Sequence, residues 1–196
     1  MVRFGYISEI ILYPTETVYA LGVNPLDREA WRALCQLKQR SDSQPASWLV
    51  RDIEDIQKYA EVGEVAARLV HKCLPGSITL VLPAKETVPR WAQSASGMVS
   101  FRMSPDTDAQ ALIAKYAKEH DAPLTCTSAN VHGLPTAPDV AGILSQFGDA
   151  ASAITTVIDG GVRRETPSTV VAVHNEKLSI LRVGPISAEE LAAALG

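Results

Sequence analysis

The sequence predicts an α/β fold with a twisted, partly parallel sheet. Short apolar runs typical of strands alternate along the chain with longer segments whose apolar residues recur every three or four positions. The 196 residues are 46% hydrophobic and 20% charged, which is typical of a globular chain that buries a core. No internal repeat, low-complexity tract or linker interrupts the chain. We therefore expect one domain over residues 1–196.

The first strand is predicted over residues 10–13 and is ended by Pro14, which lacks an N–H and has a fixed φ. Three side chains that can form hydrogen bonds follow it, Thr15, Glu16 and Thr17, and an apolar run resumes over 18–21. Asp27 is the expected N-cap of a helix that extends to about Gln39. The elements predicted next are a strand at 47–50, helices at 53–59 and 62–73, and strands at 78–82 and 98–103.

In the second half, Asp106 is expected to cap a helix that reaches about residue 119, and a strand follows at 124–127. Asp139 is the expected cap of another helix. Val157 and the next residue run into a tight turn at 159–161. Two strands at 169–173 and 178–181 are candidates for a hairpin through Asn175, and a last helix is predicted over 187–195. These patterns leave the order of the strands open.

Charge and composition exclude several classes of protein. The net charge of −4 gives no global electrostatic case for binding nucleic acid, although a local basic cleft would be compatible with it. The cysteines are odd in number and lack metal-ligand spacing, so we interpret them as reduced thiols: Cys35, Cys73 and Cys126. The four histidines are scattered, which argues against a zinc site. Neither a signal-peptide core nor a membrane-length apolar run occurs, so we expect a cytoplasmic protein that does not bind membranes.

Hydroxyl and amide side chains recur where predicted strands end. Thr15 and Thr17 follow the first strand, and Ser128 and Asn130 follow the strand at 124–127. Ser168 precedes the strand that begins at residue 169. Open α/β sheets bind ligands at the carboxyl ends of their strands, so these groups are candidates for a binding site. The alternative is that they only cap backbone groups at ordinary strand exits.

Cations form a second set of candidates. Lys38 and Arg40 end a predicted helix beside Gln44, and they could hold phosphate oxygens or simply offset the helix dipole. Arg102 stands in an otherwise apolar strand, where a guanidinium needs either an anion or access to water. Arg182 follows the last predicted strand.

The two sets together predict a cleft that binds an anion and a polar small molecule. Paired carboxylates, clustered histidines and the P-loop and Rossmann glycine motifs do not occur in the sequence. Catalysis, if any, would then depend on positioning and on stabilising charge rather than on general-base hydrolysis or redox chemistry.

Eight segments resemble, in the same order, the signature of the YrdC/TsaC-type threonylcarbamoyl-AMP synthases, in their short single-domain form. They span about residues 10–186 and read PTETVYALG, KQRSDSQP, PGSITLVL, SFRMSP, TSANVHGLPT, IDGG, PSTVV and ILRVG. The resemblance implies a YrdC-like α/β fold with a twisted, mostly parallel mixed sheet, flanked by helices around a positively lined cavity.

The resemblance also implies a reaction. Such synthases are nucleotidyltransferases that convert L-threonine, bicarbonate and ATP to threonylcarbamoyl-adenylate and pyrophosphate. Downstream tRNA threonylcarbamoyl-transfer proteins use the product to modify the adenosine next to the anticodon of certain tRNAs. Magnesium would bridge the ATP phosphates, and the absence of a clustered carboxylate site fits a metal held largely by ATP and water.

The resemblance assigns roles to individual residues. Lys38 and Arg40 would be catalytic, because they would stabilise the charge that develops at the α-phosphate. The residues implied for threonine binding are Thr15, Thr17, Arg102, Cys126 and Ser168. Those implied for ATP binding are Lys38, Arg40, Gln44, Ser128, Asn130, Thr136 and Arg182.

The sequence departs from the family pattern at Ala20, Leu49 and Met98, where glycine, histidine and a hydroxyl residue are frequent. Two other functions stay open beside the synthase. One is an RNA-binding or ribosome-maturation protein of the same fold that binds tRNA or double-stranded RNA. The other is a divergent paralogue that kept the fold without the synthase activity.

Overall fold

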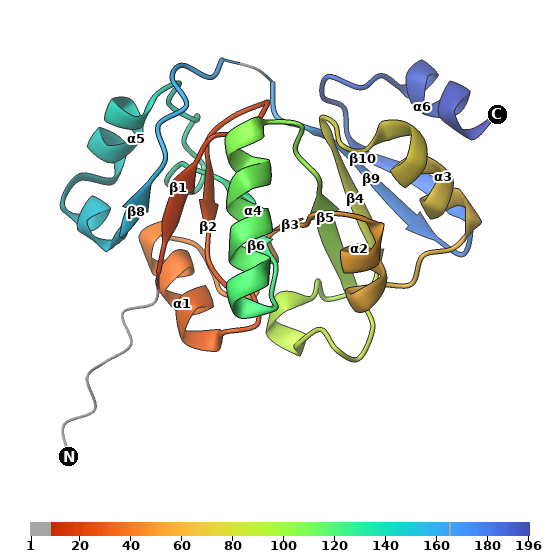
Figure 1. Ribbon diagram of the computed structural model, residues 1–196, viewed down its shortest axis with the longest axis horizontal. Helices are drawn as coiled ribbons and strands as arrows, with labels where there is room; N and C mark the ends of the chain where they lie inside the picture. The colour runs from red at the N-terminus through yellow and green to blue at the C-terminus, as the bar shows by residue number, and fades with distance from the viewer. Residues whose placement is uncertain (1–8, 165) are drawn as a thin grey trace.

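The structure is a computed structural model that describes residues 9–164 and 166–196, and its strands form two mixed sheets (Figure 1). The first sheet has the order β7 (Thr127–Ser128), β2 (Ala20–Gly22), β1 (Ile11–Tyr13) and β8 (Thr156–Val157). The second has the order β10 (Lys177–Arg182), β9 (Thr169–His174), β4 (Ile78–Pro83), β5 (Met98–Arg102), β3 (Trp48–Leu49) and β6 (Leu124–Thr125). The predicted α/β class is confirmed.

The expectation of mostly parallel pairing was wrong. Three pairs are parallel, namely β1 with β8, β3 with β5 and β4 with β9. The other five pairs between the described strands are antiparallel. Short connections explain part of this difference, because two adjacent strands joined by a tight turn can pair only in opposite directions. In the β9–β10 hairpin, the predicted turn residue Asn175 and its neighbour Glu176 both have positive φ, at 50° and 56°.

The strand predicted over residues 124–127 is divided between the two sheets. Its first half, β6, pairs with β3, and its second half, β7, pairs with β2. Cys126 lies at the division, where its backbone N–H donates to the carbonyl of Ser47 at 2.6 Å. Apolar periodicity cannot reveal such a change of partner, because both halves are extended chain. The crossing brings the two sheets together at Cys126.

Six α-helices flank the sheets within the described chain: α1 (Arg28–Leu37), α2 (Ile53–Tyr59), α3 (Glu64–Cys73), α4 (Thr107–His120), α5 (Val140–Phe147) and α6 (Ala188–Leu195). The 3₁₀ turns are η1 (Arg90–Ala92) and η2 (Gly148–Ala153). The predicted caps Asp27, Asp106 and Asp139 each accept hydrogen bonds from backbone N–H groups of their helix. Helix α1 ends two residues before the predicted Gln39, because that residue has a left-handed φ of 52°.

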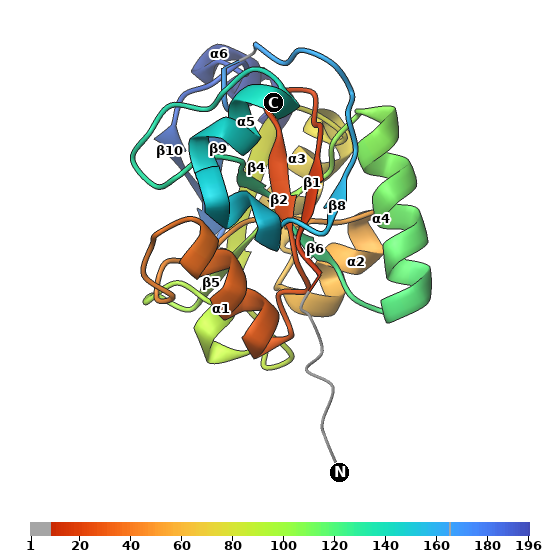
Figure 2. The ribbon, with the colours of Figure 1, turned by 90° about the vertical axis from the view of Figure 1, so that its left-hand side faces the viewer.

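Helices cover both faces of the first sheet. Alternate residues of β1 point in opposite directions, so that Leu12 packs in a cluster with α1 and α5, whereas Ile11 and Tyr13 pack with α4. Figure 2 shows α4 on one side of β1 and β2, with α1 and α5 on the other. The cluster under α4 also contains Leu49 of β3 and Leu124 of β6, so one apolar core joins the two sheets. Among the helices described, none is long and apolar enough to cross a membrane.

Candidate functional site

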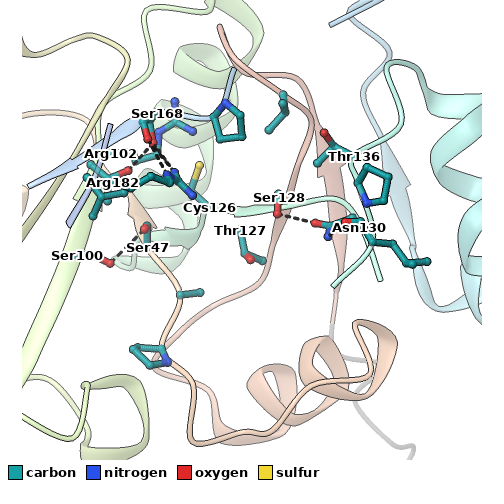
Figure 3. Close-up of a pocket in the computed structure, with 18 residues that line it drawn as sticks. Ser47, Ser100, Arg102, Cys126, Thr127, Ser128, Asn130, Thr136, Ser168 and Arg182 are labelled. Atoms are coloured by element: carbon teal, nitrogen blue, oxygen red, sulfur yellow. Dashed lines mark hydrogen bonds between the residues drawn. The ribbon is translucent and has the colours of Figure 1, made fainter. Parts of the chain in front are cut away.

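A cavity of about 540 Å³ lies between the two sheets (Figure 3). The second sheet contributes residues of β4, β5, β9 and β10, and the first contributes β7 and Val18, which lies two residues before β2. The cavity is also lined by residues to which the family resemblance assigned no role, among them Ser47, Thr79, Ser100 and Thr127. The hydroxyls of Ser47 and Ser100 lie 3.1 Å apart. Polar groups from both sheets therefore face one cavity.

The structure brings many of the predicted site residues to this cavity. Those that line it are Arg102, Cys126, Ser128, Asn130, Thr136, Ser168 and Arg182. Those that do not line it are Thr15, Thr17, Lys38, Arg40 and Gln44. Figure 3 shows Arg102, Arg182 and Ser168 gathered at one end, and Ser128, Asn130 and Thr136 at the other. Arg182 was predicted with the nucleotide group but lies with the predicted threonine group.

Arg102 is buried, with 7% of its side chain exposed, and its charge is compensated inside the protein. Its Nη2 atom forms an ion pair with Oε1 of Glu16 and donates to Oγ1 of Thr17 at 3.1 Å. Burial alone would lower the pKa of the guanidinium, but Cys126 and Glu16 raise it above its ordinary value. The arginine therefore presents a permanent positive charge at the cavity wall.

Glu16 was not among the predicted site residues. The sequence nevertheless contains a signal for this pairing. An arginine in an apolar strand requires an anion, and Glu16 is a carboxylate between two predicted site residues. The two positions are 86 residues apart, so only the fold brings them into contact.

Thr15 and Thr17 lie behind the cavity wall. The Thr15 hydroxyl donates to the carbonyl of Val18 at 2.6 Å and lies 3.1 Å from the Thr17 hydroxyl. Both residues are fully buried. Thr17 contacts a cavity-lining residue through its hydrogen bond with the guanidinium of Arg102, and its predicted direct contact with a ligand stays a prediction.

Arg182 reaches the cavity because of a β-bulge. Ile180 pairs with Val171, but Arg182, two residues later, pairs with Val170, which is the next residue on the other strand. The extra residue turns Arg182 to the face of Val170, and both residues line the cavity. Its Nε and Nη2 atoms donate to the carbonyl of Ser168 at 3.1 and 2.8 Å. Burial and the charge of Arg102 lower the pKa of Arg182.

Lys38 supports the turn formed by residues 128–130 from outside the cavity. Its ammonium donates to the carbonyl oxygens of Ser128 and Asn130, the latter at 2.8 Å, and lies 3.4 Å from Oδ1 of Asn130. The Ser128 hydroxyl in turn donates to the same Oδ1 atom at 2.5 Å. Burial, together with the nearby charge of Arg40, lowers the pKa of Lys38 to about 7.

Arg40 and Gln44 face away from the cavity. The guanidinium of Arg40 lies over the ring of Trp31, 5.2 Å from its centroid, and lines a separate surface pocket. Gln44 is exposed in the loop that follows. Two of the departures from the family pattern also lie elsewhere, because Leu49 packs in the core under α4 and Met98 pairs with Pro83 at the far end of β5.

The chemistry of the lining suits an anionic ligand that also carries polar groups. Two guanidiniums, several hydroxyls and one amide face the cavity, and its described lining residues include no carboxylate. Within residues 9–164 and 166–196, no group of three or more His, Cys, Asp or Glu side chains is placed to bind a metal ion. Binding and charge stabilisation are therefore what these residues can provide.

The chain is similar in sequence to proteins of one known family. The family model described as "Telomere recombination", for Sua5, YciO and YrdC proteins, matches residues 7–184. A threonylcarbamoyl-AMP synthase of Pyrococcus abyssi is 32% identical over 98% of this chain and 56% of its own length. One of Shigella flexneri is 32% identical over 73% of this chain and 75% of its own.

A solved structure extends the similarity to three dimensions. The structure titled as P. abyssi Sua5 complexed with L-threonine superposes with a TM-score of 0.85 at 31% identity, and covers 96% of this chain and 54% of that one. The present chain thus spans about half the length of the P. abyssi relatives that it matches.

Proposed function

The chain belongs to the Sua5/YciO/YrdC family, and on that premise we propose that it is a threonylcarbamoyl-AMP synthase. Its substrates would be L-threonine, bicarbonate and ATP, and its products threonylcarbamoyl-adenylate and pyrophosphate. The observation that carries the proposal is Arg102, a buried guanidinium at the wall of a cavity that is also lined by hydroxyl and amide groups. Such a group is suited to a small ligand with one carboxylate.

The threonine would bind at the end of the cavity where Arg102, Cys126 and Ser168 meet. Arg102 would hold the α-carboxylate. Arg182, which bonds to the Ser168 carbonyl, would then lie beside the amino group that becomes the carbamate. This placement explains why the cavity needs two guanidiniums at one end.

The nucleotide would bind at the other end, against Ser128, Asn130 and Thr136. A carbamate oxygen would attack the α-phosphorus, the bond from that phosphorus to the bridging oxygen would break, and pyrophosphate would leave. Lys38 would act here by fixing the turn that carries Ser128 and Asn130. For Arg40 to stabilise the phosphates, its side chain would have to leave the ring of Trp31.

Magnesium would enter as part of the substrate, bound to the phosphates of ATP and to water. The cavity offers hydroxyl and amide oxygens but, among its described lining residues, no carboxylate for a resident ion. We propose the tRNA threonylcarbamoyl-transfer proteins as the acceptors of the adenylate, and a role inside the cytoplasm.

The test is pyrophosphate release from ATP by the purified chain, with L-threonine and bicarbonate added separately and together. We expect release only when both are present, because the carbamate that attacks ATP needs both. Release that needs neither would contradict the proposal. ATP binding without release would favour a divergent paralogue, and a chain that binds double-stranded RNA but not ATP would favour the RNA-binding alternative.

A further inference from the structure

The carboxylate of Glu16 connects two separate parts of the protein behind the cavity wall. One oxygen pairs with Nη2 of Arg102, and the other accepts a hydrogen bond from the hydroxyl of Ser104 at 2.5 Å. The Ser104 hydroxyl also accepts from the backbone N–H of Asp106, the residue that caps α4. Glu16 thus connects the guanidinium to the start of a helix.

Glu16 lies on the side of Arg102 that faces away from the cavity. Arg102 lines the cavity and Glu16 does not, and its partner Ser104 lines a different pocket together with residues of α4. The side chain of Glu16 is 14% exposed, so its ion pair with Arg102 is largely shielded from water. Shielding strengthens the pair and makes an unpaired charge at this position costly.

The orientation of the guanidinium depends on these contacts. Nη2 makes the hydrogen bonds to Glu16 and Thr17, whereas Nε of Arg102 is buried and has no hydrogen-bond partner among the described residues. Of the two acceptors, only the carboxylate carries a charge, and a charge-assisted hydrogen bond is about twice as strong as a neutral one. Without Glu16, Thr17 alone would hold the end of the side chain.

From this arrangement we infer that Glu16 is the positioning residue of the carboxylate-binding site: it holds Arg102 so that the guanidinium is presented to the α-carboxylate of the ligand. The inference rests on the proposed function, because it takes L-threonine as that ligand. Glu16 acts through Arg102 and itself contacts no reacting atom.

Glu16 would also have a second effect on the affinity for the ligand, opposite in sign to the first. Its negative charge repels a carboxylate ligand, so its removal would strengthen binding if repulsion dominated. We expect positioning to dominate, because the guanidinium lies between the two carboxylates and can pair with both. The sign of the change in affinity therefore decides between the two roles.

The experiment measures dissociation constants of L-threonine and L-threoninol by calorimetry. L-threoninol keeps the amine and both the side-chain hydroxyl and the methyl group, but has an alcohol in place of the carboxylate. For Glu16→Gln we expect L-threonine to bind about tenfold more weakly, the loss of roughly one charge-assisted hydrogen bond. L-threoninol should change by less than about twofold, because it makes no ion pair with Arg102.

Two further variants separate positioning from loss of fold. Glu16→Asp keeps the charge but is too short to span from Arg102 to Ser104, and Ser104→Ala removes only the far end of the connection. Both variants should also weaken L-threonine binding, but by less than Glu16→Gln does. Glu64→Gln is the matched control, because it removes the carboxylate of the exposed pair with Arg68 and should leave both affinities unchanged.

The outcomes are distinct. Equal L-threonine affinity of wild type and Glu16→Gln would overturn the positioning role, and tighter binding would identify Glu16 as a competitor of the ligand instead. An equal loss for L-threonine and L-threoninol would indicate general damage to the cavity and would also overturn the role. If the wild-type chain itself binds no L-threonine, the proposed function fails first, and the role of Glu16 in threonine binding fails with it.

Discussion

Lys38 has contacts within the protein that its place in the sequence does not suggest. A lysine at a helix end, two positions before an arginine, predicts a phosphate contact, which stays a prediction. In the structure, the buried ammonium supports the turn that carries Ser128 and Asn130. Three oxygen acceptors surround the ammonium, and burial lowers its pKa to about 7. This pKa makes the residue testable by its effect on stability.

We expect Lys38 to make stability depend on pH between about 7 and 10.5. In this range the unfolded chain keeps the lysine proton and the native chain has lost it, so the free energy of unfolding rises with pH. Below pH 7 both states carry the proton, and this contribution becomes constant. The slope can reach at most about 1.4 kcal/mol per pH unit for one proton.

Urea unfolding of wild type and Lys38→Met at several pH values between 6 and about 9.5 measures this contribution. The difference in unfolding free energy should rise in favour of wild type above pH 7. Groups that do not interact with Lys38 titrate in both chains and cancel in the difference. Lys72→Met, at an exposed position of α3, serves as the control for removing a lysine. A constant difference for Lys38→Met would contradict the shifted pKa.

At the scale of elements, the residue at the N-cap position of helix α3 cannot cap the helix with a side chain. Its N-cap is Gly63, which has no side chain. The carboxylate of Glu176, in the β9–β10 turn, accepts hydrogen bonds from the backbone N–H groups of Glu64 and Val65 at 3.2 and 2.8 Å. A hairpin far along the chain thus supplies the cap and binds the edge of the second sheet to the helix that covers it.

Glu176→Ala should therefore destabilise the protein by about 1 kcal/mol, the usual cost of losing an N-cap. Alanine is the suitable replacement, because it removes the carboxylate but keeps the backbone preference of a residue with a side chain at this positive φ. Chemical denaturation gives the value. Glu86→Ala, at an exposed position, serves as the control and should lower the free energy of unfolding by only a few tenths of a kcal/mol. Equal costs for the two variants would show that the cap contributes nothing.

At the scale of the whole molecule, the cavity depends on the junction between two sheets. The apolar cluster under α4 contains residues of β1, β3 and β6, so neither sheet completes its core alone. Arg163 adds polar contacts, because it donates to the carbonyl of Thr15 and pairs with Asp106 at 2.8 Å.

We expect the two sheets to unfold together in one transition, as the single-domain prediction requires. Far-UV circular dichroism and tryptophan fluorescence should give the same midpoint, because Trp31 belongs to α1, which packs on the first sheet, and Trp48 lies in the second. ATP at about a hundred times its dissociation constant should raise the unfolding free energy by about 2.7 kcal/mol for both probes. Two separate transitions would show that the sheets are independent units.

The sequence alone predicted the α/β class, most helices with their aspartate caps, and the hairpin at Asn175, because these depend on contacts between near neighbours in the chain. It also predicted many of the residues that line the cavity, since hydroxyls and cations at strand ends are visible as a pattern.

The tertiary structure decided the rest. Division of residues 124–127 between two sheets, the bulge that turns Arg182 and the pairing of Glu16 with Arg102 each depend on segments far apart in the chain. The directions of the strands and the position of Lys38 behind its turn follow from the same long-range packing. Local patterns specify what a segment prefers, but the partner that a strand or a charge finds is determined by burial and pairing over the whole molecule.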